Sequence, residues 1–207
     1  MNRIRSVLVA LAISWGIVGV SSAGVHRWDI GEIFSNDDGT IQFIELFETI
    51  GDPSEWFFNS NDASLTMTSG DSQVFFFPSD LDTGTSTALA RALLGTAGFA
   101  DVSGVTPDWI IPDGFIPLGG GTATLGSPGF GNFEVLNFGS LLGGLNSLNF
   151  DAAGNPTIAF NSPTNFAGET GAVPEPSTAA MVALGLLALA SWRRACRSAC
   201  SYLPSAQ

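Results

Sequence analysis

The chain offers few residue types for nucleophilic or acid–base chemistry. A serine–histidine–acid triad would have to use His26, the only histidine. Both cysteines, Cys196 and Cys200, lie near the C-terminus, and their spacing, without a second pair or a nearby histidine, does not predict a zinc site. The sequence contains no Gly-x-Ser-x-Gly elbow and no P-loop. These observations predict a protein that is not an enzyme and that uses no cofactor.

Two kinds of oxygen-rich site deserve consideration. Glu32 and Glu45 lie on neighbouring predicted strands and are the best candidates for the carboxylate pair of a glycoside hydrolase, although a surface or turn role is more common for such residues. The acidic turns at Asn36–Asp38 and Asp80–Asp82 could bind Ca²⁺, but neither has the full EF-hand spacing. Asx turns explain both without a metal, so no metal site is predicted.

Three tryptophans could form a stacking platform for a carbohydrate, namely Trp28, Trp56 and Trp109. In a phenylalanine-rich β domain without disulfides, such residues more often lie in the core. Carbohydrate binding is therefore kept as an alternative function.

The N-terminus has the three parts of a secretory signal peptide. Arg3 and Arg5 provide the positive charge, and an apolar run follows at 7–20. Ser21 and Ala23 then supply the small residues that signal peptidase requires, which predicts a signal peptide at 1–23. The alternative is an uncleaved anchor helix, but the run is shorter than the ~20 residues of a membrane span.

The C-terminal part is organised in a similar way. A linker at 169–178 contains Val173, Pro174, Glu175 and Pro176. An apolar run at 179–192 follows, which we interpret as a short transmembrane helix because its centre has no polar face. Arg193 and Arg194 then predict stop-transfer and a cytoplasmic tail at 193–207, so the bulk of the chain lies outside the membrane.

This order of a Pro-Glu-Pro motif, an apolar run and an arginine pair resembles the PEP-CTERM sorting signal of bacterial surface proteins. The resemblance implies an inner-membrane intermediate, from which an exosortase, a transpeptidase-like membrane enzyme, removes the tail. It also implies a final location at the cell surface or in the extracellular matrix of a Gram-negative-type bacterium. Such chains usually end soon after the arginines, whereas this one continues to Gln207. The alternative is an ordinary membrane anchor behind a Pro-Glu-Pro linker.

The body between the two signals is strongly acidic. Residues 24–172 keep 18 of the 19 acidic residues but only Arg27 and Arg91 of the seven arginines, so their net charge is −16. Such a surface repels nucleic acid. The absence of cysteine from this body also excludes a disulfide framework.

The body predicts a single all-β domain at 24–168. Short apolar segments alternate with turn residues, which is typical of a β-sandwich or barrel. Strands are expected near residues 28–34, 41–47, 56–58, 65–68, 73–77, 109–111, 115–118, 122–125, 133–138 and 157–160. One short inserted helix is expected at 88–94, because alanine and leucine dominate there and Gly95 follows.

The segments at Glu32-Ile33 and at 42–46 resemble the start of a lamin-tail-like domain, which has an immunoglobulin-like sandwich. This second resemblance implies a binding or structural module and brings no catalytic residue with it. The sequence thus predicts a non-enzymatic structural or adhesive module at the cell surface, with extracellular polysaccharide as a possible partner. The alternative is a secreted carbohydrate-binding or carbohydrate-active protein.

Overall fold

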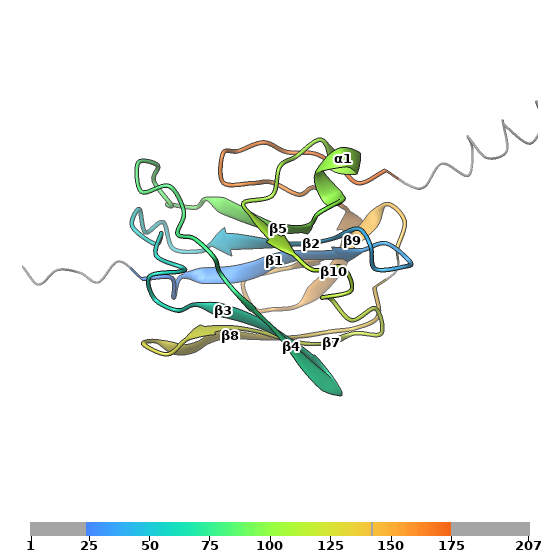
Figure 1. Cartoon of the computed structure of the whole chain (residues 1–207), viewed down its shortest axis with the longest axis horizontal. Helices are drawn as coiled ribbons and strands as arrows, with labels where there is room; N and C mark the ends of the chain where they lie inside the picture. The colour runs from blue at the N-terminus through green and yellow to red at the C-terminus, as the bar shows by residue number, and fades with distance from the viewer. Residues whose placement is uncertain (1–23, 142, 175–207) are drawn as a thin grey trace, which may run out of the picture.

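The computed structural model describes residues 24–141 and 143–174, which form two packed β-sheets (Figure 1). The six-stranded sheet has the order β10-β9-β1-β2-β5-β6, and the four-stranded sheet has the order β4-β3-β7-β8. Only β5 and β6 pair in parallel. The elements are β1 (Trp28–Ser35), β2 (Gln42–Glu48), β3 (Ser64–Ser69), β4 (Asp71–Phe76), β5 (Arg91–Thr96), α1 (Phe99–Ser103), β6 (Trp109–Ile111), β7 (Gly121–Ser127), β8 (Gly131–Phe138), β9 (Asn146–Phe150) and β10 (Pro156–Phe160). The all-β sandwich class is confirmed.

The main core lies between the two sheets, and a bulge in β1 sets which side chains enter it. The register with β2 shifts between Ile30 and Glu32, at Gly31. Because a bulge adds one residue to the alternation, Ile30 and Ile33 both pack into the inter-sheet core. Glu32 then points to the outer face of the six-stranded sheet, directly opposite Glu45 of β2.

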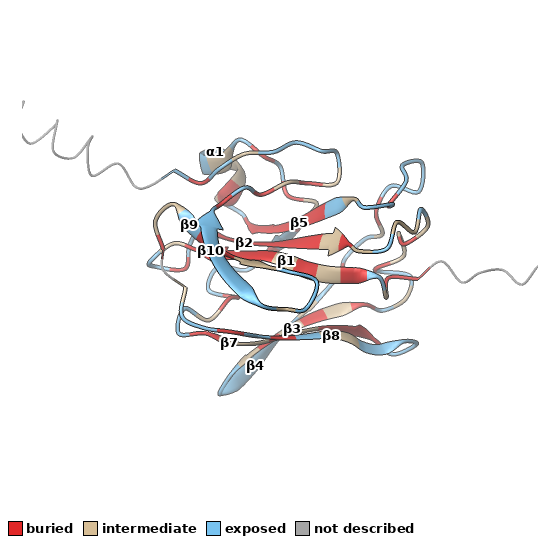
Figure 2. Cartoon of the chain, turned by 180° about the vertical axis from the view of Figure 1, so that it is seen from behind, coloured by how far each residue is buried: buried red, intermediate tan, exposed pale blue. Residues whose placement is uncertain are grey.

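A second apolar cluster covers the outer face of the same sheet. Its buried members are Phe34, Phe43, Leu93, Phe99, Val105 and Val173. Helix α1 contributes to this cover, and so does the segment after β10, which lies over the sheet in Figure 1. Consequently β1, β2 and β5 are buried on both faces, whereas β10 is exposed along its whole length (Figure 2).

The helix expected at 88–94 is wrong, because this segment leads into strand β5. Leu94 faces the inter-sheet core, while Leu93 faces the outer cluster. A strand that is buried on both faces lacks the polar alternation by which strands are recognised, so helix propensity was misleading. In the described residues, the only α-helix is the five-residue α1.

Two expected strands are also wrong. Residues 56–58 and 115–118 are irregular, and yet Phe58 and Phe115 are buried in the main core. In contrast, β9 forms at 146–150, where glycine and asparagine made the sequence signal ambiguous. The turn expected after β1 is confirmed: Gly39 has φ 75°, a conformation that favours glycine.

The expected terminal helices, the signal peptide at 1–23 and the apolar run at 179–192, lie outside the described residues. Within 24–141 and 143–174, no helix is long and apolar enough to cross a membrane.

Candidate functional site

The residues that lead into the sorting motif form a loop that lies on the outer face of the six-stranded sheet. This capping loop, residues 161–173, runs out across β1 and β2 towards β6, turns after Phe166, and comes back (Figure 1). Its two arms are joined by a bridge between Thr164 and Thr170 and by the Gly171 N–H, which donates to the Pro163 carbonyl at 3.1 Å. Residues 169–173, which the sequence assigned to a linker, form the returning arm of this loop, and Val173 at its end is buried.

Three carboxylates hold the outgoing arm by its backbone. The Ser162 N–H donates to Glu32 at 3.0 Å, and the Thr164 N–H donates to Glu45 at 2.8 Å. The Phe166 N–H donates to Asp108, which precedes β6, at 2.9 Å. The N–H of every second residue in the outgoing arm thus donates a hydrogen bond to a carboxylate. The three carboxylates follow one another in the direction from β1 to β6. These three hydrogen bonds do not depend on the side chains of the loop, because each donor is a backbone N–H group.

Further hydrogen bonds fix these acids in place. The Ser147 hydroxyl donates to Glu32 at 2.6 Å, Arg91 pairs with Glu45, and the Leu93 N–H donates to Asp108 at 2.7 Å. Burial raises the pKa of Glu32, although its hydrogen bonds from Ser147 and Ser162 oppose the rise. Burial likewise raises the pKa of Asp108, against its backbone hydrogen bonds.

Glu32 and Glu45, which the sequence placed on neighbouring strands, are cross-strand partners, but the surface or turn role that was favoured for them is wrong. Their side chains are only 1% and 0% exposed, and the capping loop lies over both. A carboxylate pair that cleaves a glycosidic bond must reach the sugar and a water molecule. Here the carboxylate oxygens accept hydrogen bonds from the protein itself, so the pair joins the loop to the sheet.

The base of the capping loop is closed by one side chain. The Val173 N–H donates to Asn161 Oδ1 at 2.6 Å, and Asn161 Nδ2 donates to the Val173 carbonyl at 3.0 Å. Asn161 Nδ2 also donates to the Leu145 carbonyl at 2.7 Å. Neither Asn161 nor Asp108 could be recognised as important from the sequence, because an asparagine or aspartate in a loop indicates only a turn.

The sorting residues are divided by the limit of the described chain. Val173 is buried and Pro174 is exposed. The other predicted residues lie outside the described ranges: Glu175, Pro176, Arg193, Arg194, Ser21 and Ala23. The sorting and cleavage roles of all these residues stay predictions.

The only histidine is packed rather than paired with a nucleophile. The His26 ring stacks on Phe130 at 4.9 Å between centroids, and its Nδ1 lies 3.5 Å from Glu55 Oε1. Glu55 in turn accepts a hydrogen bond from the Arg27 N–H at 3.3 Å.

The carboxylates of both acidic turns accept hydrogen bonds from within the protein. Asp38 accepts from the Thr40 N–H at 3.0 Å, Asp82 accepts from the Gly84 N–H at 3.0 Å, and Asp80 accepts from the Ser60 N–H at 2.8 Å. In the part of the chain that the structure describes, no group of three or more His, Cys, Asp or Glu side chains could hold a metal ion.

Two of the three tryptophans belong to the core. Trp28 and Trp109 are 0% and 2% exposed, so neither can stack on a sugar. Trp56 is partly buried, and its Nε1 donates to the Thr85 carbonyl at 2.6 Å. The core position that the sequence favoured is therefore confirmed for Trp28 and Trp109, and the alternative of a platform formed by all three tryptophans is excluded.

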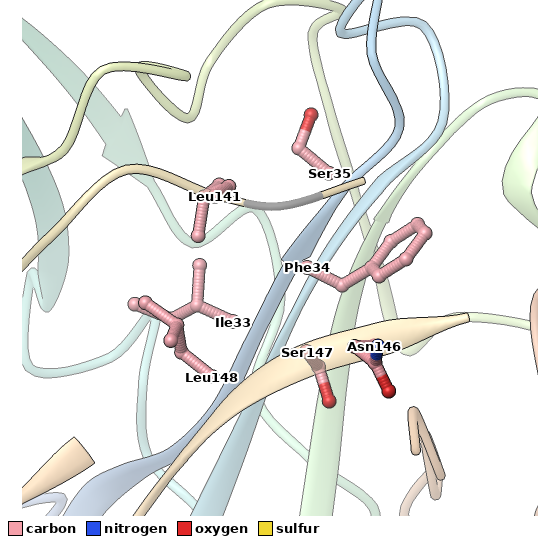
Figure 3. A pocket seen from close by; sticks show the side chains of 7 residues that line it. All are labelled: Ile33, Phe34, Ser35, Leu141, Asn146, Ser147 and Leu148. Carbon is pink, nitrogen blue, oxygen red and sulfur yellow. The ribbon is translucent and has the colours of Figure 1, made fainter. Parts of the chain in front are cut away.

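The hollows of the described surface do not present an obvious ligand site. Figure 3 shows a crevice between β1 and β9, where Ile33, Leu141 and Leu148 approach one another and leave no room for a water molecule. A wider hollow of about 400 Å³ is lined by Asp82, Asp108 and Trp109, among others, and both carboxylates already accept internal hydrogen bonds.

Comparison with known proteins identifies the C-terminal sorting motif and no other part of the chain. Residues 172–195 match the family model of the PEP-CTERM protein-sorting motif. No curated protein and no solved structure matches the chain, so the lamin-tail-like resemblance stays a prediction. The matched segment begins at Ala172, inside the base of the capping loop. The chain therefore carries a PEP-CTERM sorting motif at residues 172–195, which marks it as an exported protein that an exosortase processes.

Proposed function

We propose that this protein delivers a folded β-sandwich to the cell surface or extracellular matrix, where the sandwich acts as a non-enzymatic structural or adhesive module. The observation that carries the proposal is the position of the sorting motif: it starts at Ala172, next to Val173, which is the last buried residue of the described sandwich. A sorting tail in this position can be removed without cutting into the sandwich.

Each part of the proposed route has a physical basis in the sequence. Signal peptidase removes residues 1–23 after export. Pro174 and Pro176 keep the next segment extended and prevent a helix from continuing out of the membrane. The apolar run holds the cleavage region at the membrane surface, and Arg193 and Arg194 fix its orientation. The exosortase then separates the sandwich from this inner-membrane intermediate.

The surface of the sandwich fits an extracellular module better than a nucleic-acid-binding one. Its net charge of −16 keeps it soluble and repels nucleic acid and anionic lipid. A matrix module would meet extracellular polysaccharide, and an adhesive role would require weak binding to it. A glycan array and a hydrolase screen on the mature protein test this point, and turnover of any polysaccharide would overturn the non-enzymatic assignment.

The sorting step is tested by the intact mass of the protein recovered from the surface of native cells. We expect a mass that lacks residues 1–23 and everything C-terminal to the Pro-Glu-Pro region. A mass that still includes Cys196 and Cys200 would show an ordinary membrane anchor, and the proposed processing would be wrong. Deletion of the exosortase gene in the same cells provides the control, because it should leave the tail in place.

A further inference from the structure

The β-sandwich binds the backbone of Val173, the residue before the first proline of the sorting motif. Asn161 binds both backbone polar groups of Val173, and the two residues are only 4% and 5% exposed. Asn161 is itself fixed, since its backbone N–H and its side-chain amide both donate to the Leu145 carbonyl, at 2.9 and 2.7 Å. Asn161 is thus held in the orientation in which it binds the backbone N–H and C=O groups of Val173.

Packing of Val173 and Gly171 further fixes this part of the chain. The Val173 side chain packs in the outer cluster, against residues that include Phe34, Phe99 and Val105. Gly171 passes so close to the end of α1 that an added Cβ would lie 2.5 Å from the Ser103 carbonyl oxygen and 2.6 Å from Val105 Cγ2. Only glycine fits there without displacing backbone atoms.

We propose that Asn161 is a positioning residue that holds Val173 in the folded domain and so sets the point beyond which proteases can shorten the mature protein. It binds the backbone of Val173 to the domain, and the exposed Pro174 is the next residue along the chain. The part of this inference that concerns processing rests on the proposed function, whereas the grip on Val173 does not.

Val173 is separated from the apolar run at 179–192 by only a few residues, so its attachment to the domain limits the length of chain that an exosortase can reach. Six residue steps separate Val173 from Ala179, and a fully extended chain covers at most about 22 Å in six steps. While the tail is attached, Val173 can therefore lie no more than about 22 Å from the start of the apolar run. An exosortase in the membrane meets a short segment between two fixed ends, and its product keeps Val173 in the folded domain.

The chain contains a matched control for a test of Asn161. Asn165 lies in the same loop, is 5% exposed, and also joins backbone groups: its Nδ2 donates to the Thr106 carbonyl at 2.9 Å, and its Oδ1 accepts from the Glu169 N–H at 2.9 Å. Asn161→Ala and Asn165→Ala thus remove similar interactions, but only the first releases Val173.

The first measurement uses the purified full chain with a broad-specificity protease and peptide mapping. Cutting needs local opening, so Asn161→Ala should speed cleavage between Gly171 and Pro174 by about tenfold or more, because opening no longer breaks the two hydrogen bonds of Asn161. Asn165→Ala should leave that rate within about twofold of wild type. Equal rates in the two variants would overturn the inference.

The second measurement needs no variant and stays valid if Asn161→Ala does not fold. In hydrogen exchange on the wild-type full chain, the Val173 amide should exchange as slowly as the amides of the capping loop that bind Glu32 and Glu45. Fast exchange at Val173, with those amides protected, would overturn the inference by itself.

The third measurement concerns processing in native cells. The wild-type mature protein should have one C-terminus, at or beyond Val173, whereas Asn161→Ala should give several lower masses as host proteases trim past Val173. A single wild-type-like mass for Asn161→Ala would contradict the positioning role. If the wild-type chain keeps its tail, the proposed processing fails, and the first two measurements still decide whether Asn161 holds Val173.

Discussion

Replacement of Glu134 by glutamine should change how the stability of the sandwich depends on pH. Glu134 lies on β8 and accepts a hydrogen bond from the Ile30 N–H of β1, so its carboxyl group joins the two sheets. Burial raises the pKa of Glu134 from 4.5 to about 7; the Ile30 hydrogen bond opposes this rise and the nearby Asp29 charge adds to it. The folded protein therefore keeps a proton on Glu134 at pH values where the unfolded chain has lost it.

The sign and size of the effect follow from this difference. Between pH 4.5 and about 7 the folded state binds more protons than the unfolded state, so the free energy of unfolding falls as the pH rises through this window. At ~1.36 kcal/mol per pH unit the full difference corresponds to about 3 kcal/mol. Solvent reaches part of this side chain, so we expect a loss of about 1–3 kcal/mol. Burial also raises the pKa of Asp29, Glu32 and Asp108, which adds to the same trend.

Urea unfolding of the mature protein between pH 5 and pH 8 measures this directly. Wild type should be most stable at pH 5, and Glu134→Gln should lose a large part of the pH dependence. Asp101→Asn, at an exposed position on α1, removes the same charge and serves as the control. A wild-type stability that stays constant or rises from pH 5 to pH 8 would refute the reasoning, as would equal flattening in both variants.

Two further outcomes are expected. Glu32→Ala should lower the free energy of unfolding by about 2–4 kcal/mol, because it leaves the buried hydroxyl of Ser147 and the part-buried N–H of Ser162 without their acceptor. Glu32→Gln keeps an acceptor oxygen and should cost less. Equal losses for the two variants in urea unfolding would argue against this explanation. Thermal melts in EDTA and in millimolar Ca²⁺ should coincide, because the carboxylates of Asp38 and Asp82 already serve their own turns; a clear rise with Ca²⁺ that Asp82→Ala abolishes would instead show a calcium site.

The sequence alone determined the parts of this protein that depend on local composition. The sorting motif at 172–195 is recognisable because proline, an apolar run and arginines act in the order in which they occur along the chain. The β class followed from short apolar segments between turn residues, and it was correct for strands such as β2 and β8. Even the pairing of Glu32 with Glu45 could be expected, since their strands are neighbours in sequence.

Only the tertiary structure decided which backbone groups these acids bind and which residues cover the outer face of the six-stranded sheet. Glu32 meets Ser162 across 130 positions, and Asn161 meets Val173 across 12. A carboxylate or an amide side chain carries no mark of the backbone group that it will bind, so such contacts cannot be predicted from one sequence. Strand β5 was mistaken for a helix for a related reason: the second apolar layer that buries Leu93 is formed by distant residues, Val173 among them. The cover of the outer face, and with it the position of the sorting motif, exists only once the chain has folded.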